Sequence, residues 1–390
     1  MKSLCFISSI PAAMNSFMRE SICSSAEKWS VSMISNPDDA ALLNNLNARF
    51  IPLLFARKPK PWRDFLCLVQ LIILFQNERF DLVHSITPKV GFLSMLAAWL
   101  IGTPNRIHTF TGQVWVNKVR WKRSALKIFD KLIVLFSTHI LVDSPSQLDF
   151  LISEGVLSKG KGIVIGRGSI CGVDTNRFCP DANMRDEVRS ELSISAEQFV
   201  ILFLGRINRD KGILDLAVAF TDIASKRSNV VLVLVGAEED VLFEQIQQIC
   251  GLAIVERVHR VSFTNNPERY MAAADVFCLP SYREGFGQVI IEAGASGVPS
   301  VASRIYGITD AVEDGKTGLL FTAGDASGLT QSLLKLIDGQ FLRQEMGDAA
   351  RARALELFPS HKITEEMLKF YTDLLADSGM ATKCSRLKKS

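Results

Sequence analysis

The sequence of 390 residues lacks the patterns that mark several common protein classes. No apolar run reaches the roughly 18–20 residues that a membrane-spanning helix needs. The formal net charge of +3 is too small to indicate a nucleic-acid partner. The eight cysteines form no CxxC pair and no metal-site spacing to histidine, so we interpret them as reduced packing residues, which favours the cytoplasm. The apolar part of residues 1–10 is too short for a secretory signal, and we expect a buried first strand there.

Short apolar segments alternate with helix-like segments along the chain, whose length suits two domains. Strands are predicted near 3–8, 30–34, 50–54, 81–84, 105–109, 138–142 and 162–165, and near 199–204, 230–235, 258–263, 275–279, 299–302 and 318–321. Helices are predicted near 13–26, 63–77, 89–101, 119–136 and 146–153, and near 212–226, 239–250, 267–273, 287–296, 326–337, 340–356 and 361–376. Such repeated units predict an α/β fold with two doubly wound parallel sheets, that is, two Rossmann-like domains.

The most informative segment is 281–293, which holds Glu284 and Glu292 with a glycine-flanked turn between them. The apolar segment 276–280 before it predicts a buried strand, and the residues after the turn have helical spacing. Glu284 is therefore expected at the carboxyl end of a strand and Glu292 on the next helix. Ligands of open α/β sheets bind in that crevice.

The turn itself is Gly285, Phe286 and Gly287. Glycine lets a backbone turn sharply and approach a ligand closely. The helix that opens after the turn presents free N–H groups and the positive end of its dipole, which suits a phosphate.

Two cations follow another predicted strand, 199–204, within the segment 203–212. Arg206 and Lys211 lie on the loop that leaves this strand. A planar guanidinium fork and a compact ammonium at a crevice mouth suit a diphosphate.

The patterns Gly-Arg-x4-Lys-Gly from Gly205 and Glu-Gly-Phe-Gly-x4-Glu-Ala from Glu284 resemble retaining glycosyltransferases of the glycosyltransferase 4 type. Segments 168–178 and 315–320 also match, and the former is similar to bacterial enzymes that build surface polysaccharides. The resemblance extends to about residue 375 and implies the GT-B architecture, two Rossmann-like domains facing a central cleft.

The resemblance implies an acceptor-binding domain over 1–175 and a donor-binding domain over 176–358. A C-terminal helix, 359–377, is expected to cross back to the first domain. The basic tail 378–390 is expected to be disordered. A linker between the two domains is expected near 174–198.

The activity that the resemblance implies is transfer of a hexose or N-acetylhexosamine, with retention, from a nucleotide sugar to a glycan acceptor. The implied process is surface polysaccharide synthesis, of O-antigen, capsule or exopolysaccharide. UDP is favoured over GDP as the nucleotide, and a polyprenyl-diphosphate-linked acceptor is expected. Arg206 and Lys211 would stabilise the leaving diphosphate. Glu284 would bind a donor-sugar hydroxyl and Glu292 the ribose. No Asp-x-Asp motif ends a predicted strand, so we expect no metal and no cofactor beyond the co-substrate.

The first domain offers acceptor-side candidates at two predicted strand ends. The resemblance implies that a histidine contacts the donor sugar here, and His108 inherits that role, a structural histidine being the alternative. Thr111 and Gly112 follow in a polar loop. His84 is a weaker candidate, with a histidine bonded to backbone as the alternative.

One loop departs from the family pattern. The segment 8–16 follows the first predicted strand and contains no glycine, where the family has a glycine pair. Close backbone approach to a ligand is harder there. Its apolar character fits a lipid-linked acceptor or simple packing equally well.

The segment 115–131 combines six cations with two tryptophans. Such a helix can lie on an anionic membrane surface, or it can be a surface helix with one buried and one solvated face. The first possibility predicts a peripheral protein on the cytoplasmic face of the inner membrane.

Two other functions are compatible with this architecture. A sugar-nucleotide 2-epimerase shares it but lacks the Glu-x7-Glu string, which this chain has. A non-catalytic sugar-nucleotide-binding subunit of an assembly complex would not need the full set of Arg206, Lys211, Glu284 and Glu292.

Overall fold

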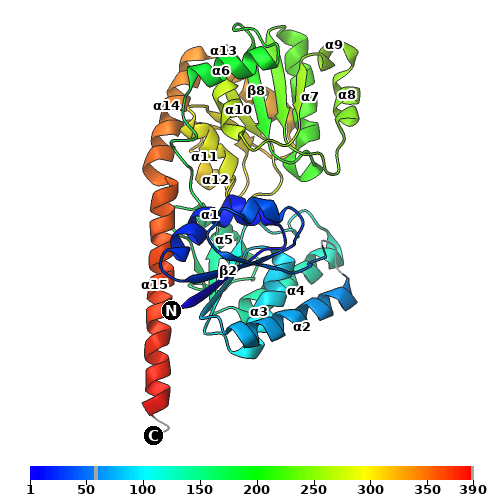
Figure 1. Cartoon of the computed structure of the whole chain (residues 1–390). Coiled ribbons are helices and arrows are strands. Elements are labelled where there is room, and N and C mark those ends of the chain that lie inside the picture. The colour runs from blue at the N-terminus through cyan, green and yellow to red at the C-terminus, as the bar shows by residue number, and fades with distance from the viewer. Residues whose placement is uncertain (57–59, 388–390) are drawn as a thin grey trace. The chain divides into compact units, whose positions relative to one another are not determined.

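The computed structural model describes residues 1–56 and 60–387, with side chains up to residue 376. The chain forms two compact units, one of residues 1–171 with the C-terminal helix and the other Gly172–Pro359. Each unit is a parallel sheet with helices on both faces, so the two predicted doubly wound sheets are confirmed (Figure 1).

The sheet of the first unit has the strand order β3-β2-β1-β4-β5-β6-β7, and all its pairs are parallel. Its strands are β1 (Ser3–Ile7), β2 (Ser30–Ser35), β3 (Arg49–Pro52), β4 (Leu82–Ser85), β5 (Asn105–Phe110), β6 (His139–Val142) and β7 (Gly162–Ile163). Its helices are α1 (Pro11–Ala26), η1 (Ala40–Leu43), α2 (Pro61–Glu78), α3 (Pro88–Ile101), α4 (Arg120–Phe136), α5 (Pro145–Ser153) and α15 (Ser360–Leu387).

The sheet of the second unit has the order β10-β9-β8-β11-β12-β13, again all parallel. Its strands are β8 (Phe199–Leu204), β9 (Val230–Val235), β10 (Val258–Val261), β11 (Val276–Leu279), β12 (Ser300–Ser303) and β13 (Gly318–Phe321). Its helices are α6 (Ala182–Glu191), η2 (Arg209–Lys211), α7 (Ile213–Lys226), α8 (Phe243–Cys250), α9 (Leu252–Val255), α10 (Pro267–Ala273), α11 (Gln288–Ala295), α12 (Ile308–Ala311), α13 (Ala326–Asp338) and α14 (Gln340–Leu357).

The chain reverses its direction of travel across each sheet at one point. In the first unit β1 and β4 are neighbours, and in the second unit β8 and β11 are neighbours. Loops that leave two such strands diverge to opposite faces, which opens a crevice at their carboxyl ends. The second crevice lies between the loop that carries Lys211 and the loop that carries Glu284.

Two boundaries differ from the sequence-based expectation. The predicted linker contains α6, whose first turn is capped by Asp181 and whose Arg185 and Arg189 both pair with Asp275, at 2.6 and 2.8 Å. Helix α15 continues to Leu387, so the tail predicted to be disordered from residue 378 is helical up to there, and residues 388–390 lie outside the described part.

Candidate active site

Two of the predicted site residues of the second unit, Lys211 and Glu284, meet at the carboxyl ends of β8 and β11. Lys211 ends the short helix η2 after β8, and Glu284 lies in the loop between β11 and α11. Lys211 Nζ donates a hydrogen bond to Glu284 Oε1, and Ser281 Oγ donates to the same oxygen at 2.8 Å. Only 18% of the lysine and 14% of the glutamate side chain is exposed. Both charges are therefore held in fixed positions before any ligand binds.

Close backbone contact brings these two loops together. Gly212 adopts φ 69°, and a Cβ there would lie 2.0 Å from the carbonyl oxygen of Pro280. Tyr282 N donates to the carbonyl of Asp210 at 2.8 Å, and Tyr282 Oη donates to Asp215 Oδ2 at 2.6 Å. The glycine that follows the lysine in the sequence pattern is therefore required by packing, because any side chain would push the loops apart.

Arg206 lies apart from the Lys211–Glu284 pair. More than half of its side chain is exposed, and it forms an ion pair with Glu239 at 2.8 Å, on the loop after β9. Glu239 also accepts a hydrogen bond from Asn208 Nδ2 at 2.7 Å, while Asn208 Oδ1 caps Lys211 N at 3.0 Å. Exposed ion pairs contribute only about 0.2–1 kcal/mol, so an incoming anion can compete for this guanidinium.

Sequence reasoning missed Asn208 and Glu239. The only signal was their position, since both lie in loops that follow apolar strands. The strand ends themselves meet closely, because a Cβ on Gly236 would lie 1.9 Å from the carbonyl oxygen of Gly205.

The glycine turn presents backbone rather than side chains. Phe286 is 1% exposed and packs edge-on against Phe358 at 5.2 Å, so its ring lies in the core and only its backbone can meet a ligand. Gly287 has φ 84° and immediately precedes α11. Gly307 lies so close to Gly285 that a Cβ on it would be 2.5 Å from the Gly285 carbonyl oxygen. The turn is thus held in place by close backbone contact with Gly307.

Glu292 lies on α11, partly buried. Burial raises the pKa of its carboxyl to about 7, while a hydrogen bond from Gln288 and the charge of Arg177 act in the opposite direction. Gln288 Nε2 also donates to the carbonyl of Gly172 at 2.5 Å. The carboxyl group therefore changes its charge near neutral pH.

The histidine candidates of the first unit are buried in its sheet. His84 lies within β4, with Nδ1 2.7 Å from Tyr371 Oη and Nε2 2.7 Å from Thr109 Oγ1, so its partners are side chains rather than the backbone expected as the alternative. Burial, and secondarily the proximity of His108, lowers the pKa of His84 to about 3. The residue is therefore neutral and ties α15 to the sheet.

His108 lies inside β5 and not at its end. It is fully buried, with Nδ1 2.8 Å from Ser85 Oγ, and Nε2 has no hydrogen-bond partner among the described residues. Burial lowers the pKa of His108 to about 3. A Cβ on Gly91 would lie 2.3 Å from the imidazole, so α3 packs directly on the ring. The residues that actually follow the strand end are Thr111, partly buried, and Gly112, with φ 114°.

The glycine-free loop after β1 is tied to the loop after β4. Ser9 N donates to Thr87 Oγ1 at 3.3 Å, and the two hydroxyls lie 3.2 Å apart. Hydroxyl groups thus connect these loops at the crevice of the first unit, where the family pattern has glycines.

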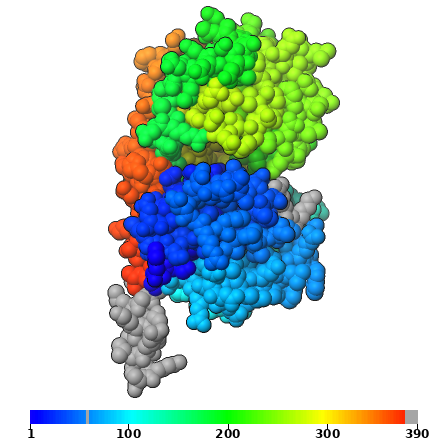
Figure 2. All heavy atoms as spheres, in the orientation of Figure 1, coloured from blue at the N-terminus to red at the C-terminus, as the bar shows by residue number. Residues whose placement is uncertain are grey.

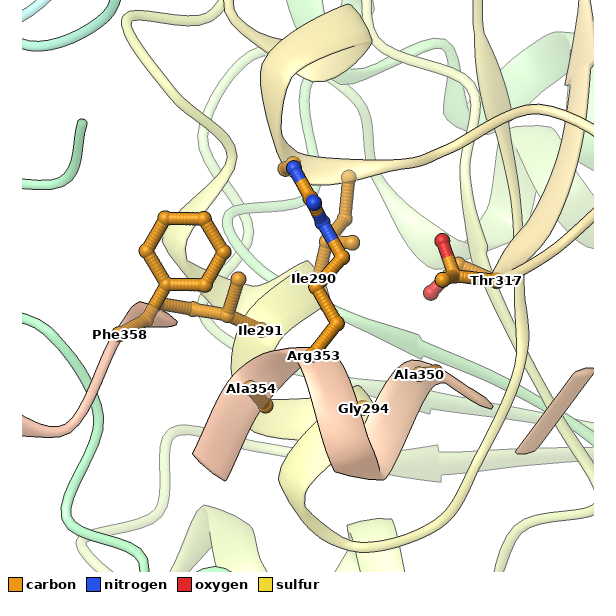
Figure 3. A pocket seen from close by; sticks show the side chains of 10 residues that line it. Ile290, Ile291, Gly294, Thr317, Ala350, Arg353, Ala354 and Phe358 are labelled. Carbon is orange, nitrogen blue, oxygen red and sulfur yellow. The ribbon is translucent and has the colours of Figure 1, made fainter. Parts of the chain in front are cut away.

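A small cavity lies elsewhere in the second unit, between α11 and α14 (Figure 3). Arg353 donates to the carbonyl of Asp310 at 2.8 Å and its guanidinium lies 5.4 Å from the centre of the Phe358 ring. Because its lining includes none of the predicted site residues, we interpret this cavity as a packing defect.

The described residues contain neither a cluster of metal-binding side chains nor a membrane-spanning helix. No group of three or more His, Cys, Asp or Glu side chains in residues 1–56 and 60–376 is arranged to hold a metal ion. Within the same ranges, none of the helices combines the length and the apolar character needed to cross a bilayer.

Comparison with known proteins agrees with this geometry. Residues 184–353 match the family of glycosyl transferases group 1, and residues 23–168 match the glycosyl transferase 4-like domain. The chain is 33% identical over 324 residues to the capsular polysaccharide biosynthesis glycosyltransferase CapM of Staphylococcus aureus, which covers 81% of this chain and 82% of CapM. It is 26% identical over 360 residues to an Escherichia coli UDP-Gal:alpha-D-GlcNAc-diphosphoundecaprenol alpha-1,3-galactosyltransferase, over 90% of this chain and 91% of that protein.

Among solved structures, Anabaena Alr3699/HepE in complex with UDP-glucose superposes with a TM-score of 0.80 at 20% identity. The match covers 96% of this chain and 100% of the Anabaena protein, and it shows a shared fold. The chain therefore belongs to the glycosyltransferase 4-type family and is a glycosyltransferase with the GT-B fold.

Proposed function

We propose that this protein is a retaining, metal-independent glycosyltransferase. It moves a hexose or N-acetylhexosamine from a UDP-sugar to a polyprenyl-diphosphate-linked glycan during surface polysaccharide synthesis, at the cytoplasmic face of the inner membrane. The observation that carries the donor half of this proposal is the fixed Lys211–Glu284 pair between the ends of β8 and β11. A cation and a carboxylate at one crevice match the two ends of the bond that breaks, a diphosphate and a sugar.

Charge determines the role of the cations. Cleavage of the bond between the sugar and the diphosphate leaves negative charge on the diphosphate, and preorganised donors lower the barrier by stabilising that charge. Lys211 has three N–H donors and uses one toward Glu284, so others remain for phosphate oxygens. Arg206 would exchange Glu239 for the diphosphate, and N–H groups at the start of α11 would add further donors.

The two glutamates take the hydroxyl groups of the donor. Glu284 keeps one oxygen for Lys211 and Ser281, and its other oxygen can accept a hydrogen bond from the transferred sugar. Glu292 accepts hydrogen bonds from the ribose hydroxyls when its carboxyl group is ionised. Phosphate binding by protein cations leaves no step that needs a divalent ion, and the departing phosphate can accept the proton of the attacking hydroxyl.

The nucleotide and the acceptor are proposed from the relatives. The Anabaena structure contains UDP-glucose, and the Escherichia coli relative is named for a UDP-sugar donor and an undecaprenol-linked acceptor. The Staphylococcus aureus relative is named for capsule synthesis.

The test is incubation of the purified protein with labelled UDP-sugars and a bacterial lipid extract, with Lys211→Ala as the inactive control. Transfer of label to lipid by the wild type alone is the expected result, and NMR of the product should show the anomeric configuration of the donor. Release of an altered free nucleotide sugar would instead identify a 2-epimerase. Donor binding without turnover of any sugar would identify a non-catalytic subunit.

A further inference from the structure

The helices α2, α3 and α4 form one layer on the sheet of the first unit. The connections β3–α2–β4, β4–α3–β5 and β5–α4–β6 all advance in the same direction across the sheet, and right-handed crossovers of this kind place their helices on one face. Helix α3 packs against both α2 and α4, so it lies in the middle of the layer (Figure 1). The inner side of the layer covers the sheet, and its outer side faces away from the sheet.

The outer side of α4 carries an apolar stripe. Trp121, Ile128 and Leu135 recur every seven residues and are 72%, 56% and 68% exposed. The opposite side of the same helix holds the buried Asp130 and Ile133. A surface helix normally turns polar residues outward. This helix instead carries exposed apolar side chains on the side that faces away from Asp130 and Ile133, which indicates that something covers that side.

The other two helices extend this apolar surface. Exposed residues at helical spacing are Trp62, Leu66 and Ile73 on α2, and Trp99 and Leu100 on α3. Aromatic contacts close the seam between α3 and α4, with Phe92 5.3 Å from Phe129 and Trp99 5.2 Å from Phe136. We call these exposed residues of α2, α3 and α4 the outer apolar face; α2 and its neighbours lie at the surface in the space-filling view (Figure 2).

Isolated exposed apolar residues are normal on a protein surface, but contiguous apolar faces mark interaction sites. The outer apolar face spans helices that are adjacent in space, so it belongs to the second kind.

The unpaired charge along α4 is of one sign, while the acidic residues of α2, Asp64 and Glu78, form ion pairs with Lys89 and Arg49. Along α4 and the residues just before it, Lys118, Arg120, Lys122 and Lys131 are exposed, and none of them forms an ion pair within the described part of the chain. The single acidic residue of α4, Asp130, is buried and accepts a hydrogen bond from Trp115 Nε1 at 2.7 Å.

The remaining two cations of the segment serve the fold instead. Arg123 and Lys127 both bind Glu154, at 2.7 and 2.8 Å, and both lie over the Trp115 ring. The six cations that the sequence analysis treated as equivalent therefore have two different roles. Only the four exposed ones can contact a partner.

These observations indicate which kind of partner contacts the outer apolar face. A second copy docking through the same face would bring like charges together, which disfavours self-association. An anionic lipid surface satisfies both features, because tryptophan and aliphatic side chains enter the headgroup region while lysine and arginine bind acidic headgroups. We propose that the outer apolar face of α2, α3 and α4 docks this protein on an anionic lipid bilayer. The inference deepens the proposed function, since it says how the enzyme reaches a lipid-linked acceptor, but it rests on the surface alone.

The test is flotation of the full-length protein with vesicles of phosphatidylglycerol and phosphatidylcholine, compared with vesicles of phosphatidylcholine alone. We expect binding to the anionic vesicles that weakens with salt. Trp121→Ser/Ile128→Ser/Leu135→Ser should lower the partition at least about tenfold, since it removes the inserting side chains. Lys118→Ser/Lys122→Ser/Lys131→Ser should lower it by a similar factor, about tenfold or more, and reduce its salt dependence.

Matched controls remove equal numbers of exposed side chains elsewhere. Val218→Ser/Leu252→Ser/Phe341→Ser removes apolar groups of the second unit that are 48%, 90% and 83% exposed, and Lys159→Ser/Lys161→Ser/Lys369→Ser removes exposed cations outside the face. Both should bind vesicles like the wild type. Circular dichroism and UDP titration should show that every variant is folded.

Three outcomes would overturn the inference: no flotation of the wild type with anionic vesicles, equal flotation of the α4 variants and the controls, or light scattering that shows a dimer lost in the apolar variant without any vesicle binding. Lys211→Ala separates this inference from the proposed function. It should float like the wild type while it loses transfer, so failure of the enzymatic proposal leaves the lipid result interpretable.

Discussion

Lys211 donates a hydrogen bond to Glu284, a residue 73 positions later in the chain. The pair exists because β8 and β11 are neighbours in the sheet and because Gly212 lets the first loop pack on the backbone of Pro280. A cation and an anion that the sequence places on separate loops thereby form one unit. Substitution of either side chain should consequently also affect the other.

Replacement of the cations should remove turnover. Lys211→Ala or Arg206→Ala should lower kcat by about 100-fold, as expected for loss of a preorganised charge contact to a leaving group. The two variants should differ in stability. Lys211→Ala leaves the largely buried Glu284 without its cation and should lower the free energy of unfolding by about 1–3 kcal/mol. Arg206→Ala breaks an exposed pair and should cost under about 0.5 kcal/mol. Initial rates and urea denaturation measure the two effects, and near-normal turnover in either variant would exclude the assigned role.

Variants of the two glutamates should differ in their affinity for UDP. Glu292→Gln should weaken UDP binding, because a neutral amide accepts hydrogen bonds from ribose less well than a carboxylate does. Glu284→Gln should leave UDP affinity nearly unchanged and lower the rate, since its proposed partner is the sugar. Isothermal titration with UDP decides between them, and the opposite pattern would exchange the two assignments.

The pH dependence should follow Glu292. Burial raises the pKa of this carboxyl from its ordinary 4.5 to about 7, so the folded protein retains a proton that the unfolded chain has released between these values. The stability contributed by this group is therefore highest at low pH and falls as the pH rises through that window. UDP affinity should change in the other direction and rise between about pH 6 and 8, because the ionised carboxylate is the better acceptor. Titration of the wild type and Glu292→Gln in parallel separates this effect from ionisation of UDP, and identical profiles would contradict it.

Replacement of His108 should mainly affect the stability of the fold rather than catalysis. Its ring is enclosed by Ser85, Phe110 and α3, so His108→Ala should lower the free energy of unfolding by about 2 kcal/mol through lost packing and an unpaired Ser85 hydroxyl. Thr111→Ala, directly after the end of the same strand, should change stability by less than about 0.5 kcal/mol. Thermal denaturation of both variants measures this. A His108→Ala protein as stable as the wild type but with a raised KM for the donor would support the sugar contact implied by the family resemblance.

Activity should persist in excess EDTA. The proposed diphosphate site consists of protein cations and backbone N–H groups, so chelation removes nothing that the reaction uses. The measurement is the transfer rate before and after dialysis against EDTA. Full loss that is restored by Mg²⁺ or Mn²⁺ would show that the diphosphate is bound through a metal.

The order of the elements could be predicted from the sequence because each signal is local. Apolar segments such as 199–204 and 230–235 are buried on both faces of a parallel sheet, and their composition already shows this. The position of Lys211 and Glu284 after such segments placed both at one edge of the sheet. Helix α6 escaped prediction because its stability comes from distant partners, Arg185 and Arg189 pairing with Asp275, rather than from an apolar stripe.

By itself the sequence determined the fold class, the family and the loops that carry the proposed donor site, since strand spacing, glycine turns and charged motifs are properties of neighbouring residues. Only the tertiary structure decided which of these residues meet. It paired Arg206 with Glu239, enclosed His108 in the sheet and turned Arg123 and Lys127 inward to Glu154. The physical reason is that burial and ion pairing depend on the packing of segments far apart in the chain, and no local pattern records which side of a strand or helix that packing will cover.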